Sequence, residues 1–412
     1  MARIGIALLV ALIAVAGCQQ KRPPVAKEAA KIDYTAPLPE GEVALKQIGP
    51  AEYPDFSAGF VSGDLDAVRK SAENSLKFFA RPSSAKAYPY LNITHDRAMA
   101  TLMAFREVLD QASSMNSQQL NQLIAEKFDV YASVGAPSPD GRGFTGEVLF
   151  TGYYTPTFDA SLTKGGPYQF PLYKRPADLI SDEGGERAGR KTDKGNVPYY
   201  TRQDIEAGQL LAGQELVYLT SRWNAYVVTV QGSGRLRLPD GKIMEVGYAG
   251  TNGYPYTSPG RQMVKDGVIP ADQLSFDTMR NYFQANPVAM DKYLWLNQRT
   301  TFFTETHGGP FGSINVPVTA FATIATDKSV YPAGMVAFVN VPMSYAGKNL
   351  AGRFMMDQDR GGAIRSAGRC DIYMGVGEGA EQMSGRQLSA GRLYYLAVKQ
   401  DLVGKYVGKP AG

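Results

Sequence analysis

Two aspartates in the C-terminal third of the chain stand close together in a pattern that suits proton-transfer chemistry. Asp359 lies in a glycine-rich segment, and Asp371 follows in residues 369–375, whose alternation predicts a β-strand. Because successive side chains of a strand point to opposite faces, Asp371 should face a surface or groove while Cys370 faces the core. Two carboxylates can therefore flank one site and exchange protons with a bound molecule. The alternative is that both are solvated residues of ordinary half-exposed strands.

The residues needed for other common chemistries are scarce in this chain. Its 412 residues include only 2 His and 2 Cys, and neither His95 nor His307 stands in a metal-ligand spacing. We therefore expect no metal site and no cofactor. A Ser-His-Asp triad with His307 stays formally open, although no nucleophile elbow accompanies it. Cys370 is expected to be a buried thiol of the core.

The composition describes a globular protein with room for two domains. Apolar residues make up 44% and charged residues 20% of the 412 positions. The formal net charge of +4 is slight for this length, and no basic cluster interleaved with aromatic residues occurs. Nucleic acid is therefore not an expected partner.

The first residues have the pattern of a lipoprotein signal. Arg3 supplies the charge, residues 4–15 form an apolar core, and the segment ends in a lipobox at Cys18. We expect residues 1–18 to hold the signal peptide and lipobox, with Cys18 as the lipidated N-terminus after cleavage. The apolar run is shorter than the ~20 residues of a spanning helix, and a signal anchor or a buried apolar segment is the alternative. Gln19, rather than an aspartate, follows the cysteine, which favours the outer membrane, facing the periplasm.

A tether and a set of helices precede the region that carries the aspartates. Residues 19–45 combine prolines with alternating charges, which predicts a flexible tether. Three helices follow: Ser62-Gly63-Asp64 can cap the first, Thr94 can cap the second, and the third starts near Asn116.

Beyond residue 146 the pattern changes to short strands separated by Gly and Pro. We expect strands at 147–154, 215–219, 225–231, 235–238 and 243–248, with a hairpin turn at Pro239-Asp240-Gly241. Helices are expected near 259–267 and 270–284, and final strands near 317–326, 335–341, 352–358, 369–375 and 391–398.

Several motifs stand in a fixed order beyond residue 145. They are Phe150-Thr151-Gly152-Tyr153-Tyr154-Thr155-Pro156, Val230-Gln231-Gly232-Ser233-Gly234, Leu238-Pro239-Asp240-Gly241, Tyr248-Ala249-Gly250-Thr251-Asn252-Gly253 and Pro317-Val318-Thr319 with Asp327. In this order they resemble the membrane-bound lytic murein transglycosylase A family. The segment around Asp359 and Asp371 is similar to that family's 3D domain, which is named for three aspartates.

The resemblance implies a mainly β protein with helices, of the α+β class. Its catalytic domain would be a double-psi β-barrel that carries the N-terminal helices. This domain would comprise residues 46–156 and 251–405, with the 3D region at 317–400. A smaller β domain would be inserted at 157–250. A groove between the two domains would hold the ligand, in agreement with the general preference of ligands for domain interfaces.

The resemblance also implies a reaction. It is cleavage of the β-1,4 bond between N-acetylmuramic acid and N-acetylglucosamine, which leaves a 1,6-anhydromuramic acid end. One acid is enough for it, because the C6 hydroxyl of the muramic acid is the nucleophile. Asp371 matches the family position that acts first as acid and then as base. Asp359 and Asp327 match the other two aspartates, which would orient Asp371, stabilise positive charge, or serve only the structure.

The candidate sugar contacts lie beside the two expected domain crossings. Aromatic faces can line sugar subsites, and glycines let a ligand approach the backbone. Plain packing or an ordinary hairpin end is the alternative for each. The candidates are Thr151, Tyr153 and Tyr154 at the first crossing, Gln231, Gly232 and Ser233 at the end of a strand, and Tyr248 and Asn252 at the return crossing.

The expected partners are peptidoglycan strands and the membrane, reached through the lipid anchor; which wall-synthesis proteins join it is unknown. Two other functions stay open. One is a non-catalytic peptidoglycan-binding lipoprotein, and the other is a two-carboxylate glycan hydrolase in which Asp359 or Asp327 activates water. Arg360 and Asn224 depart from the family pattern, and we expect these changes to affect rate more than reaction type.

Overall fold

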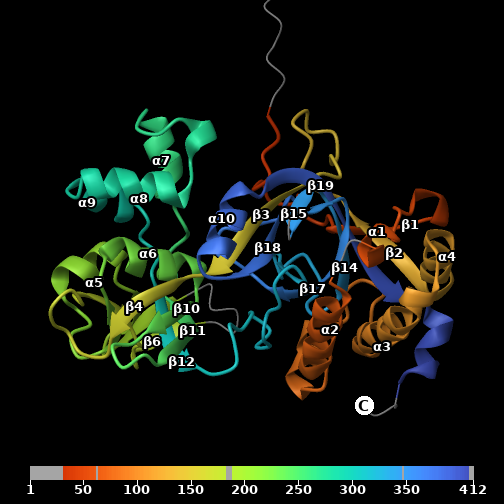
Figure 1. Ribbon diagram of the computed structural model, residues 1–412, viewed down its shortest axis with the longest axis horizontal. Coiled ribbons are helices and arrows are strands. Elements are labelled where there is room, and N and C mark those ends of the chain that lie inside the picture. Colours follow the sequence, from red (N-terminus) through yellow and green to blue (C-terminus); the bar gives the residue numbers. More distant parts are fainter. Residues whose placement is uncertain (1–30, 62–63, 182–187, 346–347, 408–412) are drawn as a thin grey trace, which may run out of the picture. The chain divides into compact units, whose positions relative to one another are not determined.

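The computed structural model describes residues 31–61, 64–181, 188–345 and 348–407 (Figure 1). The expected signal peptide with Cys18, and residues 19–30 of the expected tether, lie outside the described residues. The chain divides into two units, Met1–Lys31 and Ile32–Gly412, and all elements below belong to the second. Among the described residues, no helix has the length and apolarity that crossing a membrane requires.

Six strands close into a β-barrel. In ring order they are β19 (Leu388–Val398), β14 (Val336–Asn340), β17 (Arg353–Asp359), β13 (Thr323–Ala325), β18 (Arg369–Val376) and β3 (Val148–Thr155). The ring is closed because β3 also pairs with β19. Two further strands, β1 (Leu45–Ile48) and β2 (Phe128–Ser133), extend the sheet from β19, and β15 (Met343–Tyr345) pairs with β16 (Lys348–Leu350). Each barrel strand has a partner on both sides, which fixes its position around the ring.

Alternation along the barrel strands buries apolar side chains on one face. Cys370 and Ile372 of β18 are fully buried, whereas Asp371 between them is partly exposed. Ile372 pairs with Ile324 of β13, and Cys370 pairs with Phe150 of β3. The predicted core position of Cys370 is therefore confirmed. Burial of each large apolar side chain contributes roughly 1.5–3 kcal/mol, so this core holds the strands that carry the aspartates.

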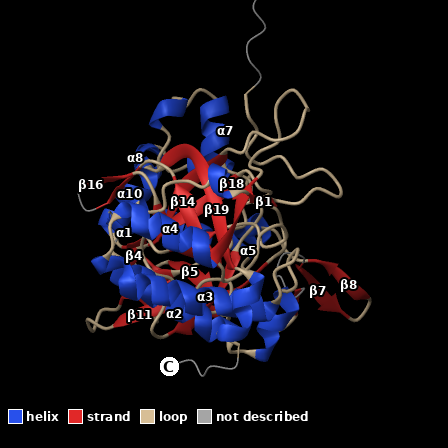
Figure 2. Ribbon diagram, turned by 90° about the vertical axis from the view of Figure 1, so that its right-hand side faces the viewer, coloured by secondary structure: helices blue, strands red, loops and turns tan. Residues whose placement is uncertain are grey.

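The N-terminal helices pack against the barrel. They are α1 (Ala58–Val61), α2 (Leu65–Phe79), α3 (His95–Gln111) and α4 (Ser117–Lys127). The predicted caps of α2 and α3 and the predicted start of α4 are confirmed, because the side chains of Asp64, Thr94 and Asn116 accept hydrogen bonds from backbone N–H groups in the first turns of these helices. The contacts join α2 to β17, and α3 to β14 and β19; Figure 2 shows these helices in front of the barrel strands. Short 3₁₀ helices are η1 (Pro50–Glu52), η2 (Pro82–Ala87), η3 (Ala112–Ser114), η4 (Ala271–Gln273) and η5 (Gln400–Lys405).

A second six-stranded sheet follows β3 in the chain. Its order is β12 (Thr301–Thr306), β11 (Ile243–Thr251), β10 (Gly234–Arg237), β4 (Thr157–Ser161), β9 (Glu215–Leu219) and β5 (Phe170–Tyr173). A three-stranded sheet comprises β6 (Leu179–Ser181), β7 (Ala188–Thr192) and β8 (Gly195–Pro198), and the helices of this region are α5 (Arg202–Gly208) and α6 (Arg222–Gln231). The predicted hairpin turn joins β10 to β11. The sheet has its own apolar core around Val217 and Leu236.

The remaining helices lie between strands of the two sheets. α7 (Pro259–Lys265), α8 (Phe276–Ala285) and α9 (Ala289–Leu294) separate β11 from β12 in the chain, and α10 (Glu378–Arg386) separates β18 from β19. Figure 1 shows α7, α8 and α9 grouped together above α6. α10 packs directly on β3 and β18. Its approach is so close at Gly152 that an added Cβ would lie 2.6 Å from the Cα of Ser384.

Two element predictions are wrong. Residues 225–231, predicted as a strand, belong to α6, which Ser221 caps at its start and Gly232 ends in the left-handed region with φ 76°. Residues 317–326 are strand only over β13, because Phe321 has φ 53°, outside the β region. The mixed α+β class with a closed barrel is confirmed.

Candidate active site

The strand register places Asp359 and Asp371 on the two sides of β13. Asp371 pairs with Ala325 of β13 and with Thr151 of β3, and Ala325 pairs with Asp359 of β17. A register shift between Ile324 and Ala325 sets Asp359 opposite Ala325. Neighbouring strands lie about 4.8 Å apart, so the Cα atoms of the two aspartates are roughly 10 Å apart. The two carboxylates therefore share one short stretch of the barrel.

Asp371 is held through only one of its carboxylate oxygens. Oδ1 accepts a hydrogen bond from the Thr151 hydroxyl, and Arg369 Nε lies 3.3 Å from the same oxygen in an ion pair. Arg369 also donates to Thr151 Oγ1 at 3.2 Å and to the Ala363 carbonyl at 3.3 Å. Among the described residues Oδ2 has no hydrogen-bond partner, and the side chain is 15% exposed. One oxygen fixes the carboxyl group, and the other stays open to a ligand.

Asp359 is engaged through both oxygens. The Tyr153 hydroxyl donates to Oδ2 at 2.9 Å, and the backbone N–H groups of Ser313 and Arg360 donate to Oδ1 at 2.9 Å and 2.8 Å. Burial raises the pKa of the Asp359 carboxyl, although these hydrogen bonds act in the opposite direction. This side chain therefore ties β17 to β3 and to the loop before β13.

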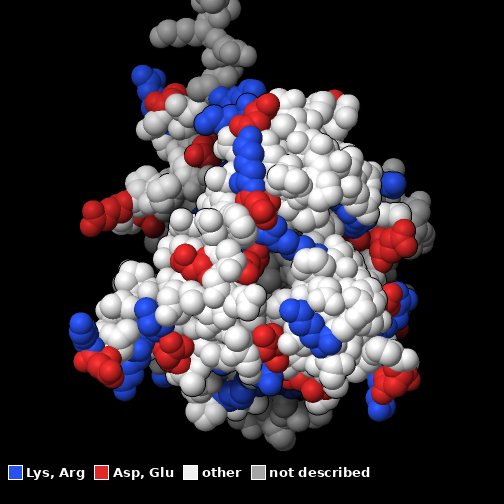
Figure 3. Space-filling model, turned by 90° about the vertical axis from the view of Figure 1, so that its left-hand side faces the viewer, with Lys and Arg blue, Asp and Glu red and all other residues white. Residues whose placement is uncertain are grey.

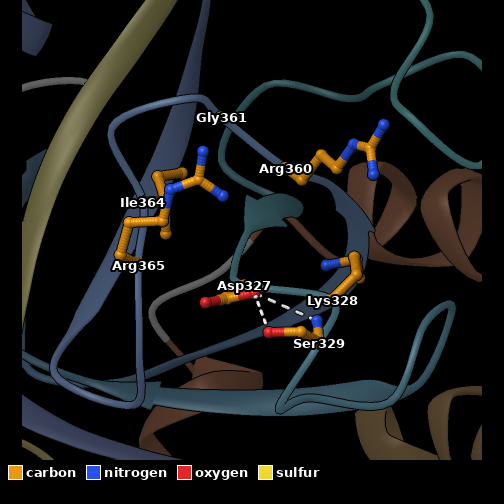
Figure 4. Close-up of a pocket in the computed structure, with 7 residues that line it drawn as sticks. All are labelled: Asp327, Lys328, Ser329, Arg360, Gly361, Ile364 and Arg365. Carbon is orange, nitrogen blue, oxygen red and sulfur yellow. Dashed lines mark hydrogen bonds between the residues drawn. The ribbon is translucent and has the colours of Figure 1, made fainter. Parts of the chain in front are cut away.

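Asp327 organises the loop that follows β13. Its Oδ1 accepts hydrogen bonds from the Ser329 N–H at 3.0 Å and the Ser329 hydroxyl at 2.6 Å (Figure 4). Its Oδ2 accepts one from the Ser366 N–H at 2.8 Å. Asp327 thus connects this loop to the one between β17 and β18, and both of its oxygens are occupied by that task.

The first crossing into the second sheet lies beside the aspartates. Thr155 Oγ1 is 3.1 Å from Ser233 Oγ and 3.0 Å from the Tyr373 hydroxyl. The Tyr154 N–H donates to Gln231 Oε1 at 3.2 Å. The predicted residues of the first crossing therefore lie next to the predicted segment around Gln231. That segment is at the end of helix α6 and not, as predicted, at the end of a strand.

Two neighbouring aromatic residues are packed differently. The rings of Tyr153 and Tyr373 lie side by side with centroids 5.1 Å apart, next to Asp359. Tyr154, on the other strand face, is buried with its ring 6.5 Å from that of Phe276 in α8. Tyr153 therefore lies with Asp359, whereas the ring of Tyr154 serves the contact between β3 and α8.

The predicted residues of the return crossing have another setting. Asn252 is buried, and its amide donates to the carbonyls of Tyr200 and Gln298 at 2.9 Å and 2.8 Å and accepts from the Thr300 N–H at 2.9 Å. Tyr248 is 45% exposed on β11. The structure therefore gives Asn252 a role in holding loops and does not place its amide with the aspartates.

Sequence reasoning missed two side chains of this region. Arg369 contacts Asp371, and the alternation that places both on one strand face was the available signal. Asp357 is fully buried, pairs with Lys328 and accepts a hydrogen bond from the Tyr395 hydroxyl at 2.7 Å. Burial raises the pKa of the Asp357 carboxyl, while Lys328 acts in the opposite direction. No local pattern separates this buried acid from an exposed one.

The chemistry on offer is that of carboxylates, hydroxyls and guanidinium groups. Within the described ranges, no group of three or more His, Cys, Asp or Glu side chains is placed to hold a metal ion. On the face shown in Figure 3, charged side chains of both signs form small clusters separated by uncharged surface. That face therefore has no broad surface of a single charge.

Comparison with known proteins identifies the family. The model of the MltA specific insert domain matches residues 149–304, and the model of the 3D domain matches residues 322–397. The membrane-bound lytic murein transglycosylase A of Escherichia coli K12 is 30% identical over 264 residues, 62% of this chain and 67% of that protein. The chain belongs to the membrane-bound lytic murein transglycosylase A family.

Further similar proteins agree with this chain in sequence or in fold. The Vibrio cholerae protein of the same name is 28% identical over 294 residues, 68% of this chain and 75% of that protein. A membrane-bound lytic murein transglycosylase from Agrobacterium tumefaciens has the same fold, with a TM-score of 0.70 at 24% identity over 88% of this chain and 99% of that one. The structure of E. coli MltA with bound chitohexaose matches this chain with a TM-score of 0.62 at 24% identity. The match covers 90% of this chain and 97% of that one. The resemblance predicted from the motifs is confirmed.

The two family models divide the site between them. The insert-domain match includes Thr151 and Tyr153 on β3, whereas the 3D match includes all three aspartates, Asp327, Asp359 and Asp371. The hydrogen bonds from Thr151 to Asp371 and from Tyr153 to Asp359 join the two matched regions. The site is thus built where both regions contribute strands to one barrel.

Proposed function

We propose that this chain is a lytic murein transglycosylase acting on peptidoglycan, which cleaves the β-1,4 bond and leaves a 1,6-anhydromuramic acid end. Its relatives carry the name of that activity, and a structural neighbour has bound chitohexaose. The observation that carries the proposal is the open oxygen of Asp371 among three aspartates whose other oxygens are engaged. Of these three, Asp371 is the one that keeps a carboxylate oxygen without a hydrogen-bond partner among the described residues, and this oxygen would exchange a proton with a sugar.

The proposed reaction is balanced by a single carboxyl group. Asp371 delivers a proton from Oδ2 to the glycosidic oxygen, the bond to C1 of the muramic acid breaks, and the departing sugar takes the proton as a hydroxyl. The C6 hydroxyl of the same muramic acid attacks C1, and Oδ2 takes the proton of that hydroxyl. Asp371 then has its starting proton again, and no water is consumed.

The other predicted residues would support this step. The hydrogen bond from Tyr153 to Asp359 favours a supporting role for Asp359, since its charge lies near the positive charge that develops at C1. Asp327 would act through the loops that it connects. Thr151 would orient Asp371, and Ser233 and Gln231 would carry the sugar-contact role beside the crossing.

The finer organisation of the chain is part of the proposal. The parallel pairs of β13 with β17 and of β18 with β3 are compatible with a double-psi barrel. The inserted domain would begin near residue 157. Because β12 completes its sheet, we expect limited proteolysis to separate a fragment that extends beyond residue 250. The chain would be anchored by lipid on Cys18 in the outer membrane; relatives are named membrane-bound.

Product analysis tests the function against its two alternatives. The full chain, purified in detergent, is incubated with murein sacculi, and the digested material is analysed by mass spectrometry. We expect 1,6-anhydromuropeptides. Reducing ends instead would indicate a two-carboxylate hydrolase, and retention of the protein on uncut murein would indicate a binding lipoprotein.

A further inference from the structure

A small cavity lies beside the proposed active site and has no part in the mechanism above. Its volume is about 280 Å³. The residues that line it are Asp327, Lys328, Ser329, Arg360, Gly361, Ile364 and Arg365 (Figure 4). This volume is slightly below the ~300–1,000 Å³ of pockets that enclose a whole small molecule, so it suits one arm of a larger ligand.

The lining of this cavity favours a negative ligand. Three of its side chains are cationic and one, Asp327, is acidic, with both of its oxygens already accepting hydrogen bonds. Lys328 is committed to the buried Asp357. The guanidinium of Arg360 has no hydrogen-bond or ion-pair partner among the described residues, although the side chain is half-buried. An unpaired, partly desolvated guanidinium gains most from a carboxylate or another oxyanion.

The directions of the two arginines select the shape of that ligand. Figure 4 shows Arg365 and Arg360 on opposite sides of the cavity, with the Arg365 guanidinium turned toward its middle and the Arg360 guanidinium turned away from Arg365. One small anion between them would not meet both groups. A short peptide with carboxylates several ångströms apart would.

We propose that this cavity is a subsite for the acidic peptide attached to the muramic acid of the substrate, with Arg360 and Arg365 binding its carboxylates. The proposal rests on the function proposed above. It makes Arg360 and Arg365 specificity-determining residues, because a strand without its peptides keeps only the lactyl carboxylate on the sugar and lacks the peptide carboxylates that reach further from it.

The subsite is connected to the catalytic carboxyl group by one loop. That loop joins β17, which ends at Asp359, to β18, which begins at Arg369. Its Ala363 carbonyl accepts a hydrogen bond from Arg369, and its Ser366 N–H binds Asp327. A peptide bound to Arg360 and Arg365 would therefore steady the loop that holds the partner of Asp371.

Direct binding is the first test. The free peptide released from murein by an amidase is titrated into the full chain by calorimetry, next to the same peptide with its carboxyl groups amidated. We expect binding only of the acidic peptide. Arg360→Gln and Arg365→Gln should each weaken it about fivefold, a value between those of exposed and buried charged pairs. Arg360→Lys should keep most of the affinity, and Arg142→Gln, which removes an exposed arginine of another loop, should keep all of it.

Cleavage of soluble glycan strands with and without their peptides is the second test. We expect the full chain to have a higher kcat/KM for strands with peptides, and this preference to fall about fivefold in Arg360→Gln. Equal binding of both peptides, or a preference that Arg360→Gln and Arg365→Gln leave unchanged, would overturn the subsite. If the full chain cuts neither type of strand, the proposed function fails instead, and the titration still decides the subsite.

Discussion

At the scale of single residues, the three aspartates differ in how their oxygens are used. Asp359 and Asp327 accept hydrogen bonds on both oxygens, whereas Asp371 keeps Oδ2 open. We predict that Asp371→Asn lowers anhydromuropeptide release by about 10²–10⁴-fold, the usual contribution of acid-base catalysis. The amide keeps an oxygen for Thr151 and Arg369, so the melting temperature should change little.

To check this prediction for Asp371→Asn, anhydromuropeptide release and a melting curve are measured on the full chain of variant and parent. Asp327→Asn is the matched control: it should lower the melting temperature more and the turnover less. An Asp371→Asn variant that keeps a tenth or more of the activity would contradict the assignment and make Asp359 the candidate acid.

Burial gives Asp359 a second, pH-dependent consequence. Because its pKa is raised, the folded chain keeps the proton to a higher pH than the unfolded chain does. The stability from this group is therefore fully present below the unfolded value of about 3.9 and is lost as the pH rises through the folded pKa. Asn at this position stays neutral, and it can accept from Ser313 and Arg360 and donate to Tyr153. We predict that the stability of Asp359→Asn, relative to that of the parent, is higher at about pH 8 than at about pH 4.

The measurement is the difference in melting temperature between variant and parent at the two pH values. A difference that does not change with pH, or that favours the variant at the lower pH, would show that the carboxyl group is not held in this way. Variant and parent are both measured as the full chain at the same pH. The effects of pH on other groups are therefore the same in both proteins and cancel in the difference.

The sequence indicated the acids of the site better than their partners. Asp359 and Asp371 could be selected because a strand pattern and a family motif coincide there. Arg369 shares a strand face with Asp371, but its contact with Ala363 depends on a loop shape that local patterns do not contain. Asn252 had the residue type of a sugar contact, yet three backbone groups use its amide. Which polar group is already occupied is decided by tertiary structure.

At the scale of elements, the contact between β3 and α10 positions the site. Gly152 lies between Thr151 and Tyr153, and an added Cβ would lie 2.6 Å from Ser384 Cα and 2.9 Å from its Cβ. We predict that Gly152→Ala destabilises the fold by about 1–3 kcal/mol, the usual cost of overpacking, and lowers activity as β3 shifts. Gly385→Ala in α10 is the control, since nothing lies within 4 Å of its added Cβ.

The control should raise stability by up to about 1 kcal/mol, because alanine favours the helix over glycine. Chemical denaturation of both variants measures the change in stability. Product release, at a temperature where each variant is folded, measures the change in activity. Equal stabilities of the two variants would mean that α10 gives way without cost.

Helix α6 shows why some elements resisted prediction. Its valine-rich run, residues 225–231, has the composition of a strand. Ser221 at the start and Gly232 at the end were the opposing signals, and the cap and the left-handed glycine are what the structure uses. The intrinsic helix propensity of this run is weak. Packing of Trp223 and Tyr226 into the main core stabilises the helix in spite of that. The N-terminal helices, by contrast, had clear caps and were predictable.

At the scale of the whole molecule, we expect the two cysteines to have separate roles, one in anchoring and one in folding. Cys18 is the proposed lipid site, whereas Cys370 is buried in the barrel. We predict that Cys18→Ala removes the lipid and that the variant leaves the outer-membrane fraction, because the remaining described chain has no apolar spanning helix. Cell fractionation checks the location of the variant, and an intact-mass measurement checks the loss of the lipid. Cys370→Ala should keep the lipid mass and the location; a Cys18→Ala chain that stays in the outer membrane would disprove the lipobox.

The ring of strands also determines when the site can exist. Thr151 and Asp371 are 220 positions apart in the chain, and β3 reaches β18 and β19 only after everything between has been made. Closing so long a loop is slow, because its entropy is lost before the contacts repay it. A chain that is still being synthesised therefore lacks the pair Thr151 and Asp371, through which the proposed acid would be oriented. If Asp371 is the acid, we therefore expect wall-cutting activity to begin only when the last strands have joined the barrel.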